Sequence, residues 1–373
     1  LKSPNASFMT ALTDAGNSIV AQEEVEGWGD DFGYHLSGTG AFYLDEFQLD
    51  EQAILTANED YWLGAPNLDK LVFKFISDPS QAANALLTGE VDLATQLSGE
   101  AINTVQNAGN GIELMKIEAL KINYVRFNMQ NGPTADPLVR QALIAAVDQD
   151  AIRTALYQYD EVMPGYLPLP YGSWAYDSSL ESMVPGYDPE HAKELLAEAG
   201  YADGFELTIN VSDSEERKTL ATMLQAYWQA IGVNAQISIN EWGTFSDTVC
   251  SGNSDVYAMS WTWYPDPYFF LNKLFSEVET SAIGNGAGYV NPEVEDLLTK
   301  AYQTTDQAER TEYYQQAMEI IMGDYAGIYY ANPYDMYGIN DRVQDFVPRA
   351  DGTLKFVESE DGETIARNVS VVD

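Results

Sequence analysis

Apolar and polar residues alternate along several short stretches of this chain, and each such stretch predicts a half-buried β-strand. Side chains in a strand point alternately to its two faces, so alternation places the apolar ones on one side. The alternating stretches are residues 42–47, 53–57, 122–128 and 205–211, and the mostly apolar residues 71–76 are a further predicted strand. Residues 255–259 are mostly apolar, which is typical of a strand buried on both faces. Residues 233–237 and 328–330 are two further predicted strands.

Four predicted helices begin with the same device, an Asp or Asn followed by proline. The acidic or amide side chain accepts bonds from free N–H groups of the first turn, and proline occupies a position where no donor is needed. The four dipeptides are Asp78-Pro79, Asp136-Pro137, Asp188-Pro189 and Asn291-Pro292. Apolar residues at helical spacing also predict helices over 219–231 and 307–322. Strands that alternate with helices in this way predict an α/β fold.

Aromatic side chains are concentrated in residues 260–270, directly after the predicted buried strand. The segment reads Ser-Trp-Thr-Trp-Tyr-Pro-Asp-Pro-Tyr-Phe-Phe. Its two prolines cannot continue the strand, because proline lacks a backbone donor and restricts the residue before it. Ligands of α/β proteins bind at the carboxyl ends of strands, and indole rings offer broad faces for stacking. We therefore predict a ligand-binding floor here; an aromatic core cluster is the alternative.

Residues spaced by two in a strand point the same way, so Trp261 and Trp263 are expected to share one side and Thr262 the other.

The composition points to two domains and excludes several classes of partner. A chain of 373 residues is long for a single core. Its formal net charge is −40, from 58 acidic and 18 basic residues, and such a surface repels nucleic acids and anionic lipid surfaces. The single cysteine, Cys250, excludes an intrachain disulfide. No stretch of eighteen apolar residues predicts a membrane span.

Motifs of catalysis are absent from the sequence. It contains no G-x-S-x-G elbow, no G-x-x-x-x-G-K-[ST] loop, no H-E-x-x-H pair and no complete calcium loop. The glycine-rich stretches at residues 38–40 and 284–288 lack the dinucleotide-binding spacing and are interpreted as turns. We expect neither cofactor nor metal. A secreted hydrolase of the glycosidase type, acting through an Asp/Glu pair, stays open as an alternative, as does a structural surface-layer protein.

Several segments resemble the extracellular solute-binding proteins of ABC importers for peptides, nickel and some oligosaccharides, family 5. In order and spacing they cover nearly the whole chain from residue 38 onward. They are Gly38-Thr39-Gly40-Ala41-Phe42, Asn58-Glu59-Asp60-Tyr61-Trp62, Leu68-Asp69-Lys70 through Gly89-Glu90-Val91-Asp92, Asp136-Pro137-Leu138-Val139-Arg140-Gln141-Ala142 with Ala146-Val147-Asp148, Tyr187-Asp188-Pro189 with Ala192-Lys193-Leu195-Leu196-Ala199-Gly200, and Tyr264-Pro265-Asp266-Pro267.

The resemblance implies a two-lobed, type II-like periplasmic-binding-protein clamp with its solute between the lobes. Lobe I would comprise residues 33–124 and 333–373 and would be incomplete at its N-terminus. Lobe II would comprise residues 125–332, and residues 1–32 would be the remnant of a small extra domain. Such a protein is not an enzyme. It would act outside the cell, as a surface lipoprotein or in the periplasm, as a monomer that delivers solute to an ABC permease.

The predicted ligand-binding residues are Trp261, Trp263, Tyr264, Asp266 and Trp242. Peptide binders of this kind commonly carry an Asp just before Tyr-Pro-Asp-Pro, where it takes the peptide's free ammonium. Here Trp263 stands at that position, and an indole offers a cation only a cation–π contact. A peptide is the expected solute, and a neutral ligand that stacks, such as an oligosaccharide, is the alternative.

The net charge generates a prediction about salt. Added NaCl is expected to raise the midpoint of thermal unfolding, because ions screen the repulsion among surface carboxylates of a chain with net charge −40. Circular dichroism from tens of millimolar to molar NaCl measures the effect. A midpoint that stays level or falls over this range would contradict it.

Overall fold

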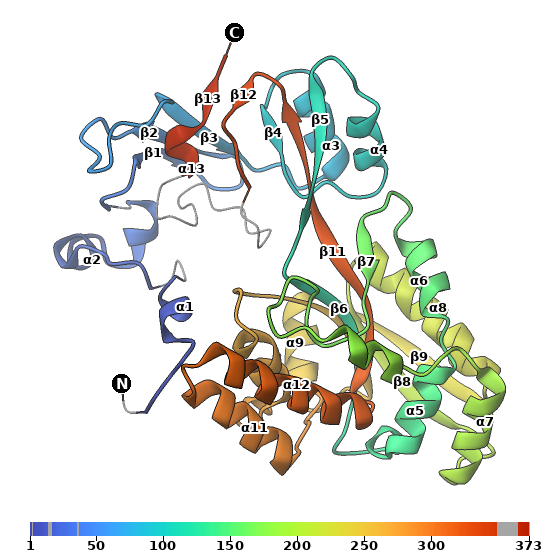
Figure 1. The fold of residues 1–373 in the computed structure, drawn as a ribbon. Coiled ribbons are helices and arrows are strands. Elements are labelled where there is room, and N and C mark those ends of the chain that lie inside the picture. Colours follow the sequence, from blue (N-terminus) through green and yellow to red (C-terminus); the bar gives the residue numbers. More distant parts are fainter. Residues whose placement is uncertain (2, 14–16, 36, 349–364, 373) are drawn as a thin grey trace. The chain divides into compact units, whose positions relative to one another are not determined.

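Two units make up the chain, and the backbone passes between them three times. Unit 1 comprises Leu1–Ala11 and Leu120–Pro333, and unit 2 comprises Leu12–Ala119 and Tyr334–Asp373. The computed structural model describes residues 1, 3–13, 17–35, 37–348 and 365–372 (Figure 1). The lobe boundaries expected from the sequence, and the assignment of residues 1–32 to an extra domain, stay predictions.

A twisted sheet forms the centre of unit 1. Strand β6 (Lys121–Phe127) pairs antiparallel with β10 (Val256–Thr262) on one side and with the first part of β11 (Gly327–Asn340) on the other. Beyond β10 lie β8 (Phe205–Ser212) and β9 (Val233–Asn240), and β10, β8 and β9 run parallel. The short β7 (Val162–Pro164) pairs with β11. The strands predicted in this part of the sequence are confirmed.

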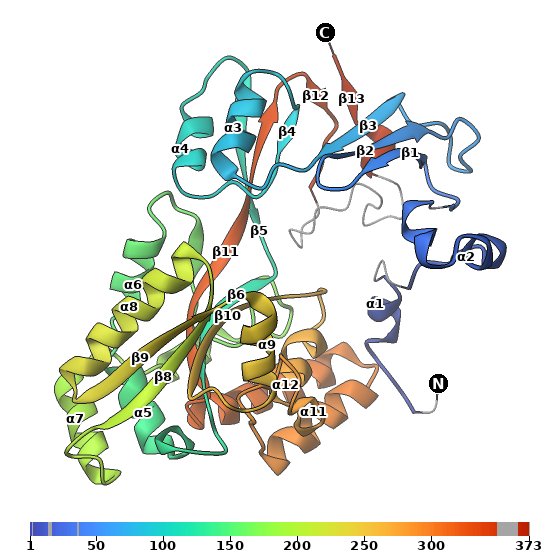
Figure 2. The same ribbon diagram turned by 180° about the vertical axis from the view of Figure 1, so that it is seen from behind.

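Helices cover both faces of this sheet, as the two opposite views in Figures 1 and 2 show. One face packs against α5 (Pro137–Ala145), α6 (Gln149–Leu156), α7 (Pro189–Glu198) and α8 (Glu215–Ala230). The other face packs against α9 (Trp242–Cys250), α10 (Lys273–Phe275), α11 (Pro292–Gln303) and α12 (Gln307–Gly323). The predicted α/β class is confirmed.

Alternation along β6 explains how one strand serves both cores. Val125 and Phe127 belong to the core under α5–α8, whereas Ile122 and Tyr124 belong to the core under α9–α12. All four side chains have no measurable exposure to solvent. Alternate residues of β6 therefore face two separate apolar layers, one on each side of the sheet.

The Asp/Asn-Pro helix starts form as the sequence predicts. Asp78 accepts a bond of 2.8 Å from the Gln81 N–H at the start of α3 (Pro79–Leu87). Asp136 accepts the corresponding backbone N–H bond at 2.8 Å at the start of α5, Asp188 at 2.9 Å at the start of α7, and Asn291 at 3.0 Å at the start of α11. Each cap satisfies a donor that the helix itself leaves free.

Unit 2 contains two larger groups of strands and one short antiparallel pair, β12 (Val343–Gln344) with β13 (Ser370–Val371). The first is an antiparallel meander of β1 (Phe42–Gln48), β2 (Gln52–Ala57) and β3 (Lys70–Lys74). In the second, β4 (Leu93–Ala94) and β5 (Ile112–Glu118) pair with the last part of β11 and carry α3 and α4 (Glu100–Gln106).

The remaining elements are short. They are α1 (Phe8–Leu12), α2 (Gln22–Trp28) and α13 (Ile365–Asn368).

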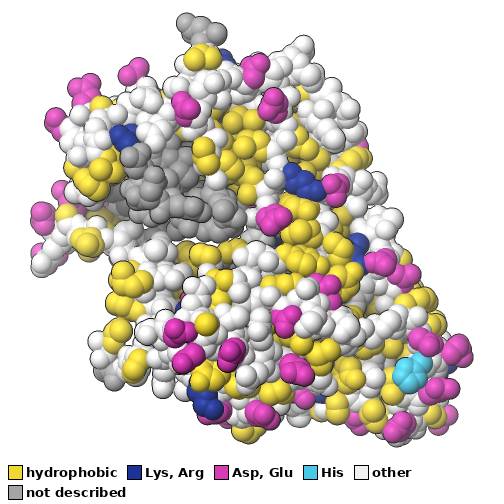
Figure 3. All heavy atoms as spheres, in the orientation of Figure 1, with side chains coloured by type: hydrophobic (Ala, Val, Ile, Leu, Met, Phe, Trp, Pro, Cys, Tyr) yellow, Lys and Arg dark blue, Asp and Glu magenta, His cyan; other side chains and the backbone are white. Residues whose placement is uncertain are grey.

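Figure 3 shows acidic side chains spread over the visible face, with few basic ones among them. This distribution agrees with the net charge of −40. Within the described part of the chain, no helix has the length and apolar character that crossing a membrane requires.

Candidate functional site

The segment after β10 folds into a stack of rings, which we call the aromatic cluster: Trp261, Trp263, Tyr264 and Phe269. The Trp261 and Trp263 rings are stacked, with centroids 5.6 Å apart and an angle of 16° between their planes. Phe269 lies nearly parallel to Trp263, at 6.3 Å and 14°, and Tyr264 meets both of these rings edge-on. The expectation that the two indoles share one side is confirmed.

The two indoles differ in their access to solvent. Trp261 is 7% exposed, and its Nε1–H donates to the Phe269 carbonyl oxygen at 2.7 Å. Trp263 is 43% exposed, so one part of its ring faces outward. Trp261 is thus the buried base of the stack, and Trp263 is the ring that a ligand can reach.

Asp266 lies inside the protein beneath this cluster. It is 5% exposed, and Arg310 Nη2 of α12 lies 2.9 Å from both carboxylate oxygens. Ser7 Oγ donates to the same carboxylate at 3.1 Å, and the Tyr268 N–H donates at 3.0 Å. These bonds hold the Pro265–Pro267 turn against α12. The ligand contact expected of Asp266 stays a prediction, while its observed contacts anchor the turn.

Gly284 provides the space into which Trp261 packs. A Cβ atom at this position would lie 2.3 Å from the Lys273 carbonyl oxygen and 3.3 Å from the Trp261 ring. Only a residue without a side chain fits so close to a neighbouring backbone. The glycine-rich stretch at residues 284–288, interpreted from the sequence as a turn, therefore also supports the aromatic cluster. Its proximity to Trp261 has no signature in the sequence.

Trp242 begins α9 and is 56% exposed. Its ring packs against Phe245, with centroids 5.6 Å apart. Among the described residues, no ring contact joins it to the aromatic cluster. Its expected role in ligand binding stays a prediction.

A polar network that no sequence pattern predicted lies on the opposite face of the same end of β10. Ser260 Oγ donates to Asn123 Oδ1 at 2.6 Å and accepts from Arg217. Arg217 Nη1 also donates to the Tyr330 hydroxyl at 2.7 Å. The Tyr157 hydroxyl donates to Glu216 Oε1 at 2.7 Å, and Tyr330 reaches the same oxygen at 3.3 Å. The network consists of Asn123, Tyr157, Glu216, Arg217, Ser260 and Tyr330.

Burial raises the pKa of Tyr157 and Tyr330 well above the ordinary value for tyrosine. Both hydroxyls therefore stay protonated, and each can donate its hydrogen to Glu216. The network has a single carboxylate, Glu216, whose side chain is 37% exposed. It can present hydroxyl and carboxylate oxygens together, but it contains no pair of carboxylates of the kind that glycosidases use.

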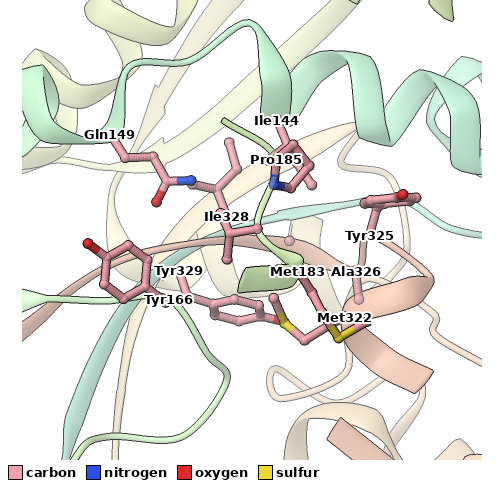
Figure 4. Close-up of a pocket in the computed structure, with 12 residues that line it drawn as sticks. Ile144, Gln149, Tyr166, Met183, Pro185, Met322, Tyr325, Ala326, Ile328 and Tyr329 are labelled. Carbon is pink, nitrogen blue, oxygen red and sulfur yellow. The ribbon is translucent and has the colours of Figure 1, made fainter. Parts of the chain in front are cut away.

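Three cavities lie elsewhere. One of them lies in unit 1 and has a volume of about 10 Å³, which is enough for one water molecule. Figure 4 shows Gln149 and Tyr166 on one side of this cavity and Met322 and Tyr325 on the other. A polar one of about 440 Å³ adjoins residues 284–288. The third, also about 440 Å³, lies in unit 2 beside β3. None of the five expected site residues lines these three cavities.

No group of three or more His, Cys, Asp or Glu side chains in the described ranges is arranged to hold a metal ion.

Comparisons with known proteins show strong similarity over most of the chain. The sequence profile of the bacterial extracellular solute-binding proteins, family 5 (middle region), matches residues 1–282. The dipeptide-binding protein of Escherichia coli K12 is 32% identical over 337 residues, which are 87% of this chain and 62% of that protein. Heme-binding protein A of Haemophilus influenzae is 31% identical, over 83% of this chain and 57% of its own length. The chain thus spans less than two thirds of these relatives.

Solved structures agree with the fold. The ABC transporter-associated periplasmic binding protein DppA of Helicobacter pylori, in complex with the peptide STSA, matches with a TM-score of 0.82 and 29% identity, over 100% of this chain and 71% of that one. A dipeptide-binding protein from Pseudoalteromonas in complex with Met-Leu gives 0.81 and 26%, over 99% and 72%. The type II-like periplasmic-binding-protein fold class expected from the sequence is confirmed.

The ion pair beneath the aromatic cluster yields a stability prediction. Asp266→Asn leaves Arg310 buried without its counter-charge, and breaking such a pair costs about 3–5 kcal/mol of unfolding free energy. Urea denaturation measures the loss. The control is Asp296→Asn, whose partner Lys300 lies 2.6 Å away on an exposed surface, and whose removal should cost far less. Equal losses from the two variants would show that Asp266 does not anchor the turn.

Gly284→Ala tests the packing of the Trp261 ring against Gly284. The added methyl group forces the backbone near Lys273 and the indole apart, and overpacking of this kind costs about 1–3 kcal/mol. The emission maximum of tryptophan should also shift to longer wavelength as the ring loses its packing. Gly186→Ala is the matched control, because a Cβ there meets nothing within 4 Å. An unshifted spectrum with full stability would refute the role of Gly284.

Proposed function

Because the chain belongs to family 5 of the bacterial extracellular solute-binding proteins, we propose that it captures a peptide-like solute on the aromatic cluster and delivers it to an ABC permease. The observation that carries this proposal is the exposed face of Trp263 in a stack whose base, Trp261, is fixed by a hydrogen bond. A ring held in one orientation loses little entropy when a ligand packs on it.

The chemistry of Trp263 suits a peptide. The planar amide groups and apolar side chains of a peptide can pack on an indole face, which removes apolar surface from water. A free amino terminus above the ring would add a cation–π contact of about 0.5–2 kcal/mol. This contact would take the place of the carboxylate that peptide binders of this kind commonly carry just before Tyr-Pro-Asp-Pro.

Similar proteins support a peptide as the solute. The matched Helicobacter pylori and Pseudoalteromonas structures contain the peptides STSA and Met-Leu, and the matched Escherichia coli protein is a dipeptide-binding protein. An oligosaccharide is the competing solute, because sugar rings also stack on exposed indoles. No catalytic step is proposed, so a bound peptide should be recovered intact.

The proposed setting is outside the cytoplasm, either on the cell surface through a lipid anchor or in the periplasm. The family is extracellular by its description. We propose that the protein acts as a monomer, with the permease as its protein partner and no nucleic acid ligand. The net charge of −40 supports the exclusion of nucleic acids.

Truncation of Trp263 tests the proposed function. Isothermal titration calorimetry is run with a panel of di- and tripeptides and a panel of malto- and cello-oligosaccharides. We expect a peptide to bind, and Trp263→Ala to weaken that binding by about 2 kcal/mol, or roughly thirtyfold, as the loss of an aromatic anchor does.

The control is Trp28→Ala, because Trp28 is 45% exposed, close to the 43% of Trp263, yet stacks on His35 in unit 2. This variant should bind the peptide as the unaltered protein does. Binding of oligosaccharides but not of peptides, or an unchanged affinity in Trp263→Ala, would overturn the proposal.

A further inference from the structure

A second polar group is buried in unit 1, and we call it the arginine cluster: Arg126, Tyr124, Tyr257 and Tyr329. Strand register brings these residues together on one face of the sheet. Tyr124 and Arg126 are two residues apart on β6, Tyr257 of β10 lies opposite Arg126, and Tyr329 of β11 lies opposite Tyr124. Tyr257 precedes Trp261 by four residues, about 13 Å along a strand, so this is not the aromatic cluster.

Most hydrogen-bond donors of the arginine cluster have no acceptor among the described residues. Arg126 has no measurable exposure; its Nη1 donates to the Leu274 carbonyl oxygen at 3.2 Å, and its guanidinium lies 4.4 Å from the centre of the Phe275 ring. Its Nε and Nη2 groups have no acceptor, and the hydroxyls of Tyr124 and Tyr329 have no partner. The Tyr257 hydroxyl oxygen faces the Ala287 backbone N–H, but its hydrogen has no acceptor. All four side chains are at most 3% exposed.

Arg126 differs in this respect from the other buried arginines. Arg310 pairs with Asp266, Arg217 lies 3.6 Å from Glu216, and Arg153 pairs with Asp150. Arg140 donates from three nitrogens to the backbone carbonyls of Thr134, Ala135 and Asp324. Among the described residues, no carboxylate forms an ion pair with Arg126.

A guanidinium cannot release its proton inside a protein, so the charge of Arg126 has to be balanced by something else. The carboxylate of Asp324 accepts bonds from the Tyr289 hydroxyl at 2.8 Å and from Asn291 at 3.0 Å, and it forms no ion pair with Arg126. An uncompensated buried charge is among the most unfavourable features a fold can carry.

We propose that the arginine cluster binds a small inorganic anion, chloride under ordinary conditions, in the core of unit 1. The unpaired groups are N–H and O–H donors, which is the set that an anion requires. Burial raises the pKa of Tyr124, Tyr257 and Tyr329, so their hydroxyls stay protonated and can donate. No residue of the proposed peptide site takes part, so this inference stands independently of the proposed function.

Gly327 shows how closely the arginine cluster is packed. It lies opposite Arg126, and the position that a Cβ would occupy there is 3.0 Å from Arg126 Cδ and 3.5 Å from the Tyr329 hydroxyl. The guanidinium arm and this hydroxyl therefore converge beside a residue without a side chain. Gly327 and Tyr329 also line the cavity of about 10 Å³ drawn in Figure 4, whereas Arg126, Tyr124 and Tyr257 do not. Because the cluster is packed closely and its side chains are at most 3% exposed, it can accept only a small anion and excludes sulfate or an organic acid.

The acidic surface does not prevent such binding. At about 0.15 M salt the potential of surface carboxylates is screened over about 8 Å. The guanidinium would instead touch the anion directly, in surroundings of low dielectric constant, where attraction between opposite charges is many times stronger than in water. The local charge of Arg126 therefore outweighs the net charge of the chain.

Replacing chloride with gluconate at constant ionic strength tests the proposal, because gluconate screens charges equally but is too large for the site. The unfolding midpoint in sodium chloride is expected to exceed that in sodium gluconate by about 2–4 °C, and the difference should saturate with chloride. Arg126→Met should abolish the difference. Tyr329→Phe keeps the ring, removes one donor and should reduce the difference, which provides a second test should Arg126→Met not fold.

Arg342→Met is the control, because Arg342 lies in unit 2 and pairs with Asp92; it should retain the full chloride effect. Crystals grown in sodium bromide should show an anomalous scattering peak beside Nε or Nη2 of Arg126. Equal midpoints in the two salts, a chloride effect that survives Arg126→Met, or water without bromide at the cluster would each overturn the proposal. A bromide peak without any chloride effect would mark an adventitious ion only.

Discussion

The buried ion pair between Asp266 and Arg310 is the interaction on which the candidate site depends. It joins the turn after β10 to α12, and Ser7 adds a third segment, 259 residues away along the chain. In a site almost without water, each charge requires the other. The turn that follows Trp263 is therefore held in place by contacts from two distant segments. The buried contacts of Asp266 therefore fix the backbone next to the exposed Trp263 ring.

Positive charge has an unusual distribution in this protein. Of 18 basic residues, five arginines are buried within unit 1, at positions 126, 140, 153, 217 and 310. Arginine suits such positions because its planar group donates several bonds in fixed directions. The surface is consequently even more acidic than the net charge suggests, and the interior holds the cations that organise both the aromatic cluster and the arginine cluster.

Local patterns predicted the elements of the fold but not the partners of their polar residues. The Asp/Asn-Pro starts and the alternation along β6 depend on neighbours a few residues apart, so the sequence reveals them directly. The stacking of Trp261 and Trp263 follows from the same period of two. The partner of Asp266, Arg310, lies 44 residues later in the chain. Gly284 lies in a loop and packs against Trp261. Arg217 is in helix α8 and donates to Ser260 of strand β10. Such contacts depend on tertiary packing, and no short-range pattern encodes them.

The proposed solute contacts the outward face of Trp263. A crystal structure of the protein with a di- or tripeptide that it binds in solution is the most direct test of this contact. We expect electron density for the peptide in van der Waals contact with the Trp263 ring, on the side away from the buried Trp261. Density for the peptide at a position that leaves Trp263 untouched would contradict it.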